Sequence, residues 1–282
     1  MTAFFGPGGN SDSFKKEGKK STLEAPAWVA SKGLNAYEFE AGRGLYTSSD
    51  ILVKIGTEAK KHCVKLSYHA PYFISLSGIE EEKRLKSIGY IRESLDAAYA
   101  LGADIIVVHT GSASKISRDE AMRLAGDTLV KTLASVDTHG VKIGLETMGK
   151  INQLGTLNEV IELCRIDKAF VPVIDFGHLN ARECGGVFNS ADDYYRVFDK
   201  IDGALGSDIA KNLHCHFSKI EYKAGGEYKH LTFEDTLFGP DFEPLIDVIS
   251  DNGLTPTIIC ESAGTQLEDA IAMKKYYESK KL

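Results

Sequence analysis

Eight short apolar runs recur along the chain at intervals of roughly 30 to 45 residues, the length of a strand–helix unit with its loops. Most of these runs are rich in valine and isoleucine, which is typical of buried parallel strands. The predicted strands are residues 3–6, 36–39, 64–69, 105–109, 141–146, 170–175, 212–217 and 257–261.

Segments between these runs place apolar residues at steps of three and four, as amphipathic helices do. In the clearest one, residues 82–101, Leu85, Ile88 and Leu95 share one face and Gly102 provides a stop. Further helices are predicted at 118–136, 158–164, 192–198 and 242–250.

The alternation of strands and helices predicts an α/β fold, a single (β/α)8 TIM barrel that forms one domain over residues 1–282. An open doubly wound sheet is the alternative. It is disfavoured because no glycine-rich dinucleotide fingerprint follows the first strand.

Polar residues mark the carboxyl ends of the predicted strands or follow them closely. In a TIM barrel these ends meet at one mouth, where active sites lie. Imidazole and carboxylate groups are the preferred ligands of zinc and similar divalent metals. The residues concerned are His69, His109, Glu146, Asp175, His178, His214, His216, His230 and Glu261.

This set is larger than one ion can use, because a catalytic zinc takes about three protein ligands. We therefore expect two or three metal ions, with Glu146, at the centre of the set, as a bridging ligand. Such clusters activate water and stabilise the entering and leaving oxygens in phosphodiester hydrolysis.

Composition and charge narrow the remaining classes of protein. The content of 43% hydrophobic and 26% charged residues is ordinary for a soluble globular protein, and no apolar stretch or signal sequence indicates membrane association or export, so a cytoplasmic location is expected. The five cysteines form no CxxC pair, and Cys215 and Cys260 are predicted to be reduced core residues. The net charge of −7 gives no support to nonspecific binding of nucleic acid over the whole surface. It does not exclude local binding, because bound metal ions or a basic groove can make the local electrostatic potential positive.

Six short motifs, in order along nearly the whole chain, resemble the endonuclease IV family of apurinic/apyrimidinic endonucleases, which are xylose-isomerase-like barrels. The segment His69-Ala70-Pro71-Tyr72-Phe73-Ile74-Ser75-Leu76 resembles the family's His-x-x-Tyr-Leu-Ile-Asn-Leu. The others are His109-Thr110-Gly111, Glu146-Thr147-Met148-Gly149, Asp175-Phe176-Gly177-His178, His214-Cys215-His216-Phe217-Ser218-Lys219 and Glu261-Ser262.

The resemblance implies zinc as the metal, with manganese as an alternative, and a role for each ligand. His69 and His109 would hold one ion and Glu146 would bridge it to a second; Asp175, His214 and Glu261 would complete the second ion, and His178 and His230 would hold a third.

The resemblance also implies the substrate and the reaction. The substrate would be double-stranded DNA with an abasic site, cut on the 5′ side by a metal-bound hydroxide that Glu146 positions. Tyr72 and Phe73 would enter the minor groove. The loop after the second predicted strand departs from the family's usual DNA-contacting loop, although its Arg43 could reach a phosphate. An abasic nucleotide is easily flipped out because it has no base to unstack. No obligate protein partner is implied.

One departure from the family concerns the third ion. The family has an aspartate two residues before the histidine matched by His230, where this chain has Tyr228. Glu227 is the nearest replacement ligand, and Asp235 is a weaker one.

Two other functions stay open. A sugar isomerase or epimerase on the same barrel would use one manganese or magnesium ion held by Glu146, Asp175 and Glu261. A barrel without activity that binds damaged DNA or a partner is the third alternative, against which the nearly complete ligand set argues.

Overall fold

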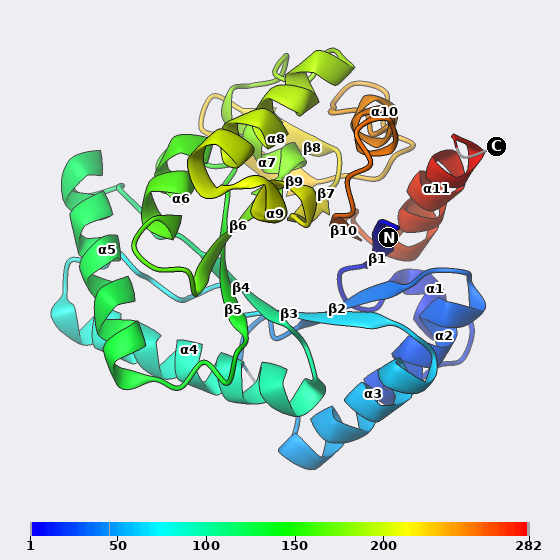
Figure 1. Ribbon diagram of the computed structural model, residues 1–282, viewed down its shortest axis with the longest axis horizontal. Coiled ribbons are helices and arrows are strands. Elements are labelled where there is room, and N and C mark those ends of the chain that lie inside the picture. The colour runs from blue at the N-terminus through cyan, green and yellow to red at the C-terminus, as the bar shows by residue number, and fades with distance from the viewer. Residues whose placement is uncertain (1, 45, 281–282) are drawn as a thin grey trace.

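Eight parallel strands form the centre of the protein. The computed structural model describes residues 2–44 and 46–280. The strands follow the order β1-β10-β7-β6-β5-β4-β3-β2, and the helices surround them (Figure 1). Their bounds are β1 Phe4–Pro7, β2 Ala36–Glu40, β3 Lys65–His69, β4 Ile105–His109, β5 Lys142–Glu146, β6 Phe170–Asp175, β7 His214–Phe217 and β10 Thr257–Cys260. The predicted TIM barrel and its eight strands are confirmed, with small differences at the strand ends.

The sheet closes where β1 meets β2. Gly8 forms a parallel bridge with Glu38, and the Asn35 amide N–H donates to the carbonyl of Phe5. A Cβ at Gly6 would lie 1.8 Å from the carbonyl oxygen of Ala36, so only glycine allows this close approach of the two strands.

The helices cover the outside of the barrel. They are α1 Asp12–Lys16, α2 Ala25–Ser31, α3 Ser49–Lys61, α4 Glu81–Leu101, α5 Arg118–Ser135, α6 Leu157–Cys164, α7 Phe176–Arg182, α8 Ala191–Leu205, α9 Ser207–Lys211, α10 Glu243–Asp251 and α11 Gln266–Ser279, with a 3-10 turn at Thr22–Glu24. All five predicted helices are present, although α8 extends well beyond the predicted 192–198. The apolar periodicity of α8 is carried past Phe198 by the buried Ile201.

The lumen of the barrel is apolar only in part. Ile106 and Val108 face the outer core, and their neighbours Ile105 and Val107 therefore point inward, where they form a separate small cluster with Val173. Around the remaining inward positions the structure buries charged and polar side chains: Glu38, Ser67, His69, Glu146, His214 and His216.

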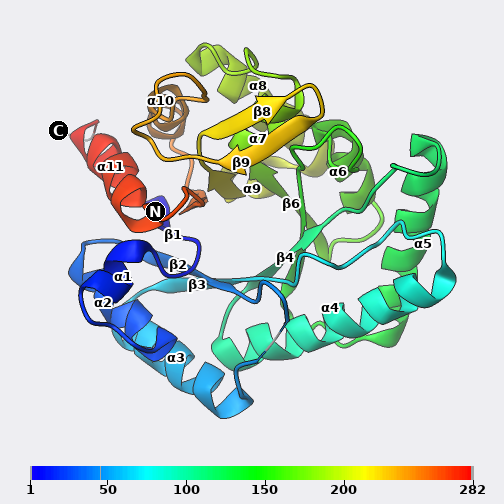
Figure 2. The same ribbon diagram turned by 180° about the vertical axis from the view of Figure 1, so that it is seen from behind.

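A β-hairpin that the sequence analysis did not predict lies over the carboxyl ends of the barrel strands. It consists of β8 Ile220–Lys223 and β9 Gly226–His230. The Ile151 amide N–H donates to the carbonyl of Gly225, so the hairpin pairs with the loop after β5. Figure 2 shows the hairpin in front of the barrel.

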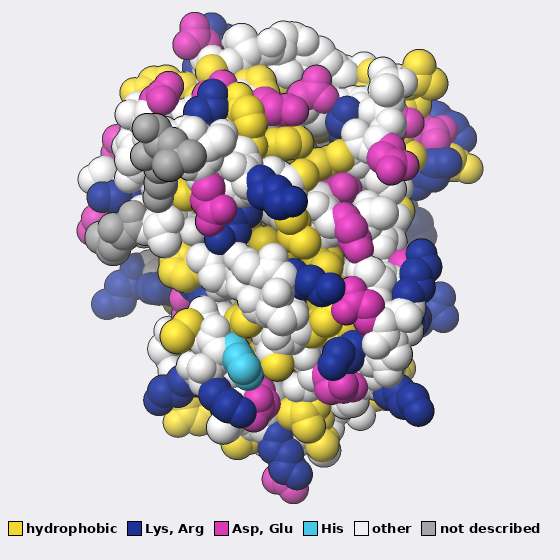
Figure 3. Space-filling view, turned by 90° about the vertical axis from the view of Figure 1, so that its right-hand side faces the viewer, with side chains coloured by type: hydrophobic (Ala, Val, Ile, Leu, Met, Phe, Trp, Pro, Cys, Tyr) yellow, Lys and Arg dark blue, Asp and Glu magenta, His cyan; other side chains and the backbone are white. Residues whose placement is uncertain are grey.

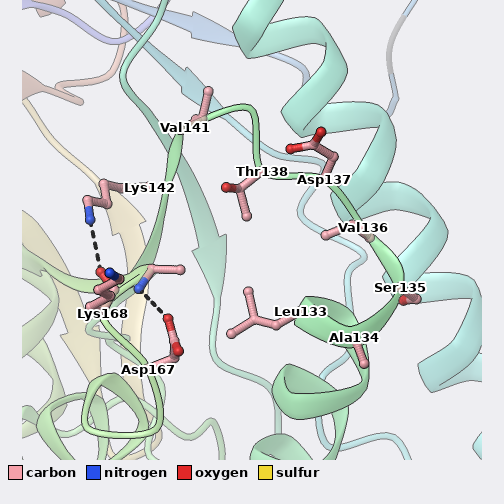
Figure 4. Close-up of a pocket in the computed structure, with 12 residues that line it drawn as sticks. Leu133, Ala134, Ser135, Val136, Asp137, Thr138, Val141, Lys142, Asp167 and Lys168 are labelled. Carbon is pink, nitrogen blue, oxygen red and sulfur yellow. Dashed lines mark hydrogen bonds between the residues drawn. The ribbon is translucent and has the colours of Figure 1, made fainter.

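A separate surface pocket lies at the other end of the strands, between the end of α5 and the start of β5 (Figure 4). The Lys142 ammonium donates to the carbonyl of Lys168, and the Ala169 amide donates to the side chain of Asp167. These contacts lie where β5 and β6 begin, at the amino-terminal end of the barrel strands.

The outer surface carries both signs of charge. On the face shown in Figure 3, acidic and basic side chains are interspersed. No helix in the described parts of the chain is long and apolar enough to cross a membrane. Cys215 and Cys260 are buried free thiols, as predicted.

Candidate metal centre

The register of the barrel strands brings the predicted ligands to one level. His109 of β4 is paired with Glu146 of β5, and Asp175 of β6 is paired with His216 of β7. Because the strands are parallel, these side chains meet at the carboxyl end of the barrel, as the sequence predicts.

Glu146 occupies the centre of this level, and its side chain is buried. Its Oε2 atom lies 3.3 Å from His109 Nε2 and 3.6 Å from His69 Nε2. This Oε2 atom has no hydrogen-bond partner in the described structure. His69, His109 and Glu146 thus form a first group that could hold a metal ion.

A second group shares Glu146 and adds Asp175, His216 and Glu261. His216 Nδ1 lies 3.1 Å from Glu146 Oε1 and 3.2 Å from Glu261 Oε1. The Oδ2 atom of Asp175 is buried and has no hydrogen-bond partner among the residues that the structure describes. Glu146 therefore belongs to both groups, as a bridging ligand would.

The β7 residue in this group is His216, and not His214 as the sequence analysis predicted. His214 starts β7 and pairs in register with Val173, one step deeper in the barrel than His216. Its Nε2 atom lies 2.9 Å from Glu38 Oε2. The two histidines share one strand face, so the pattern His-x-His did not reveal which of them lies level with Asp175.

A third group consists of His178, Glu227 and His230. Glu227 Oε2 lies 3.5 Å from His178 Nε2, and Glu227 Oε1 lies 4.0 Å from His230 Nε2. The hairpin turns Tyr228 outward, where it is half-exposed beneath the Lys223 ammonium. Glu227, the replacement ligand considered from the sequence, thus lies close to both His178 and His230.

Asp235, the other replacement considered, is not part of this group. Its carboxylate accepts hydrogen bonds from the backbone amides of Leu237 and Phe238 and closes its own turn.

The charges at the mouth fit divalent cations. Burial alone would raise the pKa of Glu146, but the neighbouring rings of His178, His216 and His69 hold it well below its ordinary value. Burial, together with repulsion from the carboxylates of Glu146 and Asp175, raises the pKa of Glu261 to about 8. Burial lowers the pKa of His109 to about 4, so its ring is neutral at pH 7, the form that binds a metal.

These observations test whether the residues fit a metal. Burying a polar atom without a hydrogen-bond partner costs on the order of a few kcal/mol, and within the described residues Glu146 Oε2 and Asp175 Oδ2 are such atoms. A divalent ion removes that cost. The donor set of imidazoles and carboxylates suits zinc or manganese.

The residues expected to contact DNA lie on the rim. Tyr72 is 53% exposed and Phe73 is 39% exposed, and their rings pack edge to face. Phe73 also packs on Tyr90, which anchors it. Arg43 is exposed in the loop after β2, where the neighbouring Gly42 carbonyl accepts the amide N–H of Tyr72. The three side chains thus lie on adjacent loops.

Two carboxylates on β2 were not identified from the sequence. Glu38 is fully buried beneath the metal groups, and Glu40 ends the strand at the mouth in register with His69. Their period-two spacing in Tyr37-Glu38-Phe39-Glu40 was the available signal. It did not show that this face of the strand points into the barrel.

Comparison with known proteins agrees with this architecture. An uncharacterized protein of Methanocaldococcus jannaschii, MJ0133, is 30% identical over 87% of this chain and 88% of its own length. A probable endonuclease 4 of Shouchella clausii is 25% identical over 73% of each chain.

Solved structures share the fold at low identity. A D-tagatose 3-epimerase-like protein superposes with a TM-score of 0.71, at 19% identity over 98% of this chain and 96% of its own. Endonuclease IV from Thermus thermophilus superposes with a TM-score of 0.68, at 18% identity over 98% of each chain.

The predicted resemblance to endonuclease IV is confirmed by these similarities, and the barrel is shared with sugar epimerases. Residues 26–277 match the model of a family described as xylose isomerase-like TIM barrels. The chain therefore belongs to the xylose isomerase-like TIM barrel family.

Proposed function

We propose that the chain is a metal-dependent phosphodiesterase that cleaves DNA on the 5′ side of abasic sites and uses two or three zinc or manganese ions. The observation that carries this proposal is the presence of three adjacent ligand groups, two of which share Glu146. A single-ion reaction does not need the His69–His109 pair or the His178–Glu227–His230 group. The similarity to a probable endonuclease 4 supports the same activity.

The arrangement assigns a task to each part of the mouth. Divalent ions at such a cluster activate water and neutralise the charge that develops on phosphate oxygens. Glu146 would join the first two groups and fix the spacing between them. Tyr72, Phe73 and Arg43 stand on the rim, where they would hold the duplex and keep the abasic nucleotide turned toward the ligands.

The direct test is incision of a duplex that carries one tetrahydrofuran abasic analogue. The zinc- or manganese-loaded protein should cut 5′ to the analogue and leave a 3′-hydroxyl end. Chelation should abolish the cut, and restoring the metal should return it. An undamaged duplex of the same sequence is the control. A fully metallated protein that leaves the analogue uncut contradicts the proposal.

A sugar epimerase is the second candidate, because Glu146, Asp175, His216 and Glu261 form a complete four-ligand group by themselves. The similarity to an epimerase-like barrel shows the fold alone. Metal content separates the two candidates. One manganese or magnesium ion per chain, with turnover of a ketose, would favour the epimerase, whereas two or three ions favour the nuclease.

A further inference from the structure

Glu38 is a buried carboxylate outside the three ligand groups described above, and with His214 and His216 it forms a further cluster whose atoms lie close enough together to hold an ion. It lies in the middle of β2 and is fully buried. Between β2 and β7 stand the two strands β1 and β10, so its side chain reaches the histidines of β7 across the lumen. Its two oxygens meet two rings there: Oε1 lies 2.9 Å from His216 Nε2, and Oε2 lies 2.9 Å from His214 Nε2.

Glu38 Oε1 and His216 Nε2 face each other in the lumen. Neither His216 Nε2 nor Glu38 Oε1 has an aligned hydrogen-bond partner in the described structure, each other included, although the two atoms lie only 2.9 Å apart. A buried carboxylate oxygen and a buried ring nitrogen are costly without a partner. Glu38 is therefore the group available to accept the Nε2 proton of His216.

Other histidines at the mouth are oriented in the opposite sense. The Nδ1 atom of His69 lies 2.8 Å from the carbonyl of Ala70, and the Nδ1 atom of His178 lies 3.0 Å from the carbonyl of Thr147. Donation of the Nδ1 proton to a carbonyl leaves Nε2 free to bind a metal. In His216 the nitrogen that faces Glu146 and Glu261 is instead Nδ1.

We propose that Glu38 is a positioning residue that accepts the Nε2 proton of His216 and so presents His216 Nδ1 to the metal held with Glu146, Asp175 and Glu261. His214 fixes Glu38 from the other side, through its Nε2–Oε2 hydrogen bond. Carboxylates that accept the second ring proton of a ligating histidine select its tautomer and strengthen it as a ligand. This inference rests on the metal site of the proposed function, but not on the reaction or its substrate.

The test measures metal affinity in the full chain by competition with a chromophoric zinc chelator. Glu38→Gln should weaken zinc binding at the His216 group by about 10- to 100-fold, the range for loss of such a partner. Glu162→Gln is the control, because it also removes one carboxylate charge, at an exposed position of α6 outside the three ligand groups. It should change the affinity by less than about fivefold.

Thermal unfolding of the metal-free variants separates positioning from a purely structural role. If Glu38 served only the fold, Glu38→Gln would lower the unfolding temperature and leave the zinc affinity unchanged, and this result would overturn the proposal. The ring tautomer of His216 in the zinc-loaded wild-type protein is a second readout, which does not require Glu38→Gln to fold. Its 15N shifts, assigned with His216→Gln, should show a metal-bound Nδ1 and a protonated Nε2.

The reverse tautomer would also overturn the proposal. A wild-type protein that binds no zinc, manganese or magnesium would instead refute the proposed function itself. Unchanged affinity in a folded Glu38→Gln variant, with a wild-type protein that does bind metal, would refute only the role of Glu38.

Discussion

Gly149 lies directly against Glu227. A Cβ at position 149 would come within 2.6 Å of Glu227 Cβ and 3.0 Å of His178 Cδ2. The carbonyl of Gly149 also accepts the amide N–H of Glu227. The loop after β5 and the hairpin of β8 and β9 therefore depend on a position without a side chain, and the third ligand group is assembled at this contact.

Gly149→Ala should push Glu227 away from His178 and remove the third metal ion while the other two groups remain. We expect the zinc content to fall by one ion per chain, measured by atomic emission on dialysed protein. Gly89→Ala is the control, because a Cβ at this helical position of α4 meets no atom within 4 Å. That variant should keep its zinc and gain up to about 1 kcal/mol of stability, since alanine favours the helix. Equal metal content in both variants would contradict this view of the hairpin.

Glu146→Gln should have the largest effect of any single substitution at the mouth, because Glu146 belongs to two groups. The variant should lose affinity at both, and incision of the abasic duplex should fall by about a thousandfold or more, since metal stabilisation of the transition state is worth several kcal/mol. Single-turnover incision at saturating zinc measures the loss. A variant that cuts within tenfold of the wild-type rate would exclude a bridging role.

The sequence predicted most of the barrel because each strand is a separate apolar run and each ligand ends or follows such a run. What it did not predict depends on contacts between distant segments. The choice of His216 over His214 is made by strand register, which aligns His216 with Asp175. The place of Glu227 is set by the hairpin, whose Ala224-Gly225 turn is a recognisable signal but whose docking on the loop after β5 is not.

The position of Glu38 also depends on a distant segment and was not predicted from the sequence. Alternation along Tyr37-Glu38-Phe39-Glu40 predicts that both glutamates share one face of the strand. Because the middle of a barrel is usually filled by apolar side chains, this pattern alone does not indicate that the shared face points into the lumen. The lumen accepts Glu38 only because His214 and His216 of a distant strand meet it there.

Metal binding should release protons. Burial lowers the pKa of His69, but the carboxylates of Glu40, Glu146 and Glu38 raise it to about 10, and the pKa of Glu261 is raised to about 8. Both groups are therefore protonated at pH 7 without metal and must lose their protons to become ligands. Zinc affinity should strengthen as pH rises from 6 to 8. Titration calorimetry in two buffers with different ionisation enthalpies measures the release, and a binding heat independent of the buffer would contradict it.

The Glu159–Arg118 pair should stabilise the loop after β5 in a pH-dependent manner. Burial raises the pKa of Glu159, but Arg118 and the backbone amides of Thr156 and Gly155 lower it to about 2. Arg118 also donates to the carbonyls of Ile151 and Gln153 in that loop. Because the folded-state pKa is depressed, the stabilisation is fully present above the ordinary value of 4.5 and is lost as pH falls toward 2.

Glu159→Gln should therefore lower the free energy of unfolding by about 2 kcal/mol at pH 7, the scale of hydrogen bonds to a charged group. The difference from wild type should shrink as pH falls from 4.5 toward 2, in urea unfolding followed by circular dichroism. Glu162→Gln, on the same helix, is the control. A deficit that stays constant over this pH range would mean that the charge of Glu159 contributes nothing.

Tyr72 should contribute to substrate binding without contributing to the fold. Its ring is 53% exposed and rests on Phe73, which Tyr90 anchors in turn. Tyr72→Ala should weaken binding of an abasic-analogue duplex by about tenfold, the lower end for loss of an aromatic contact with a base, and should change the stability by less than about 0.5 kcal/mol. Tyr99→Ala is the matched control, since Tyr99 is 63% exposed on α4 and stacks on His139 outside the metal groups. Fluorescence anisotropy at fixed salt measures both. If the two variants bind the duplex equally well, the rim beside β3 is not where the DNA lies.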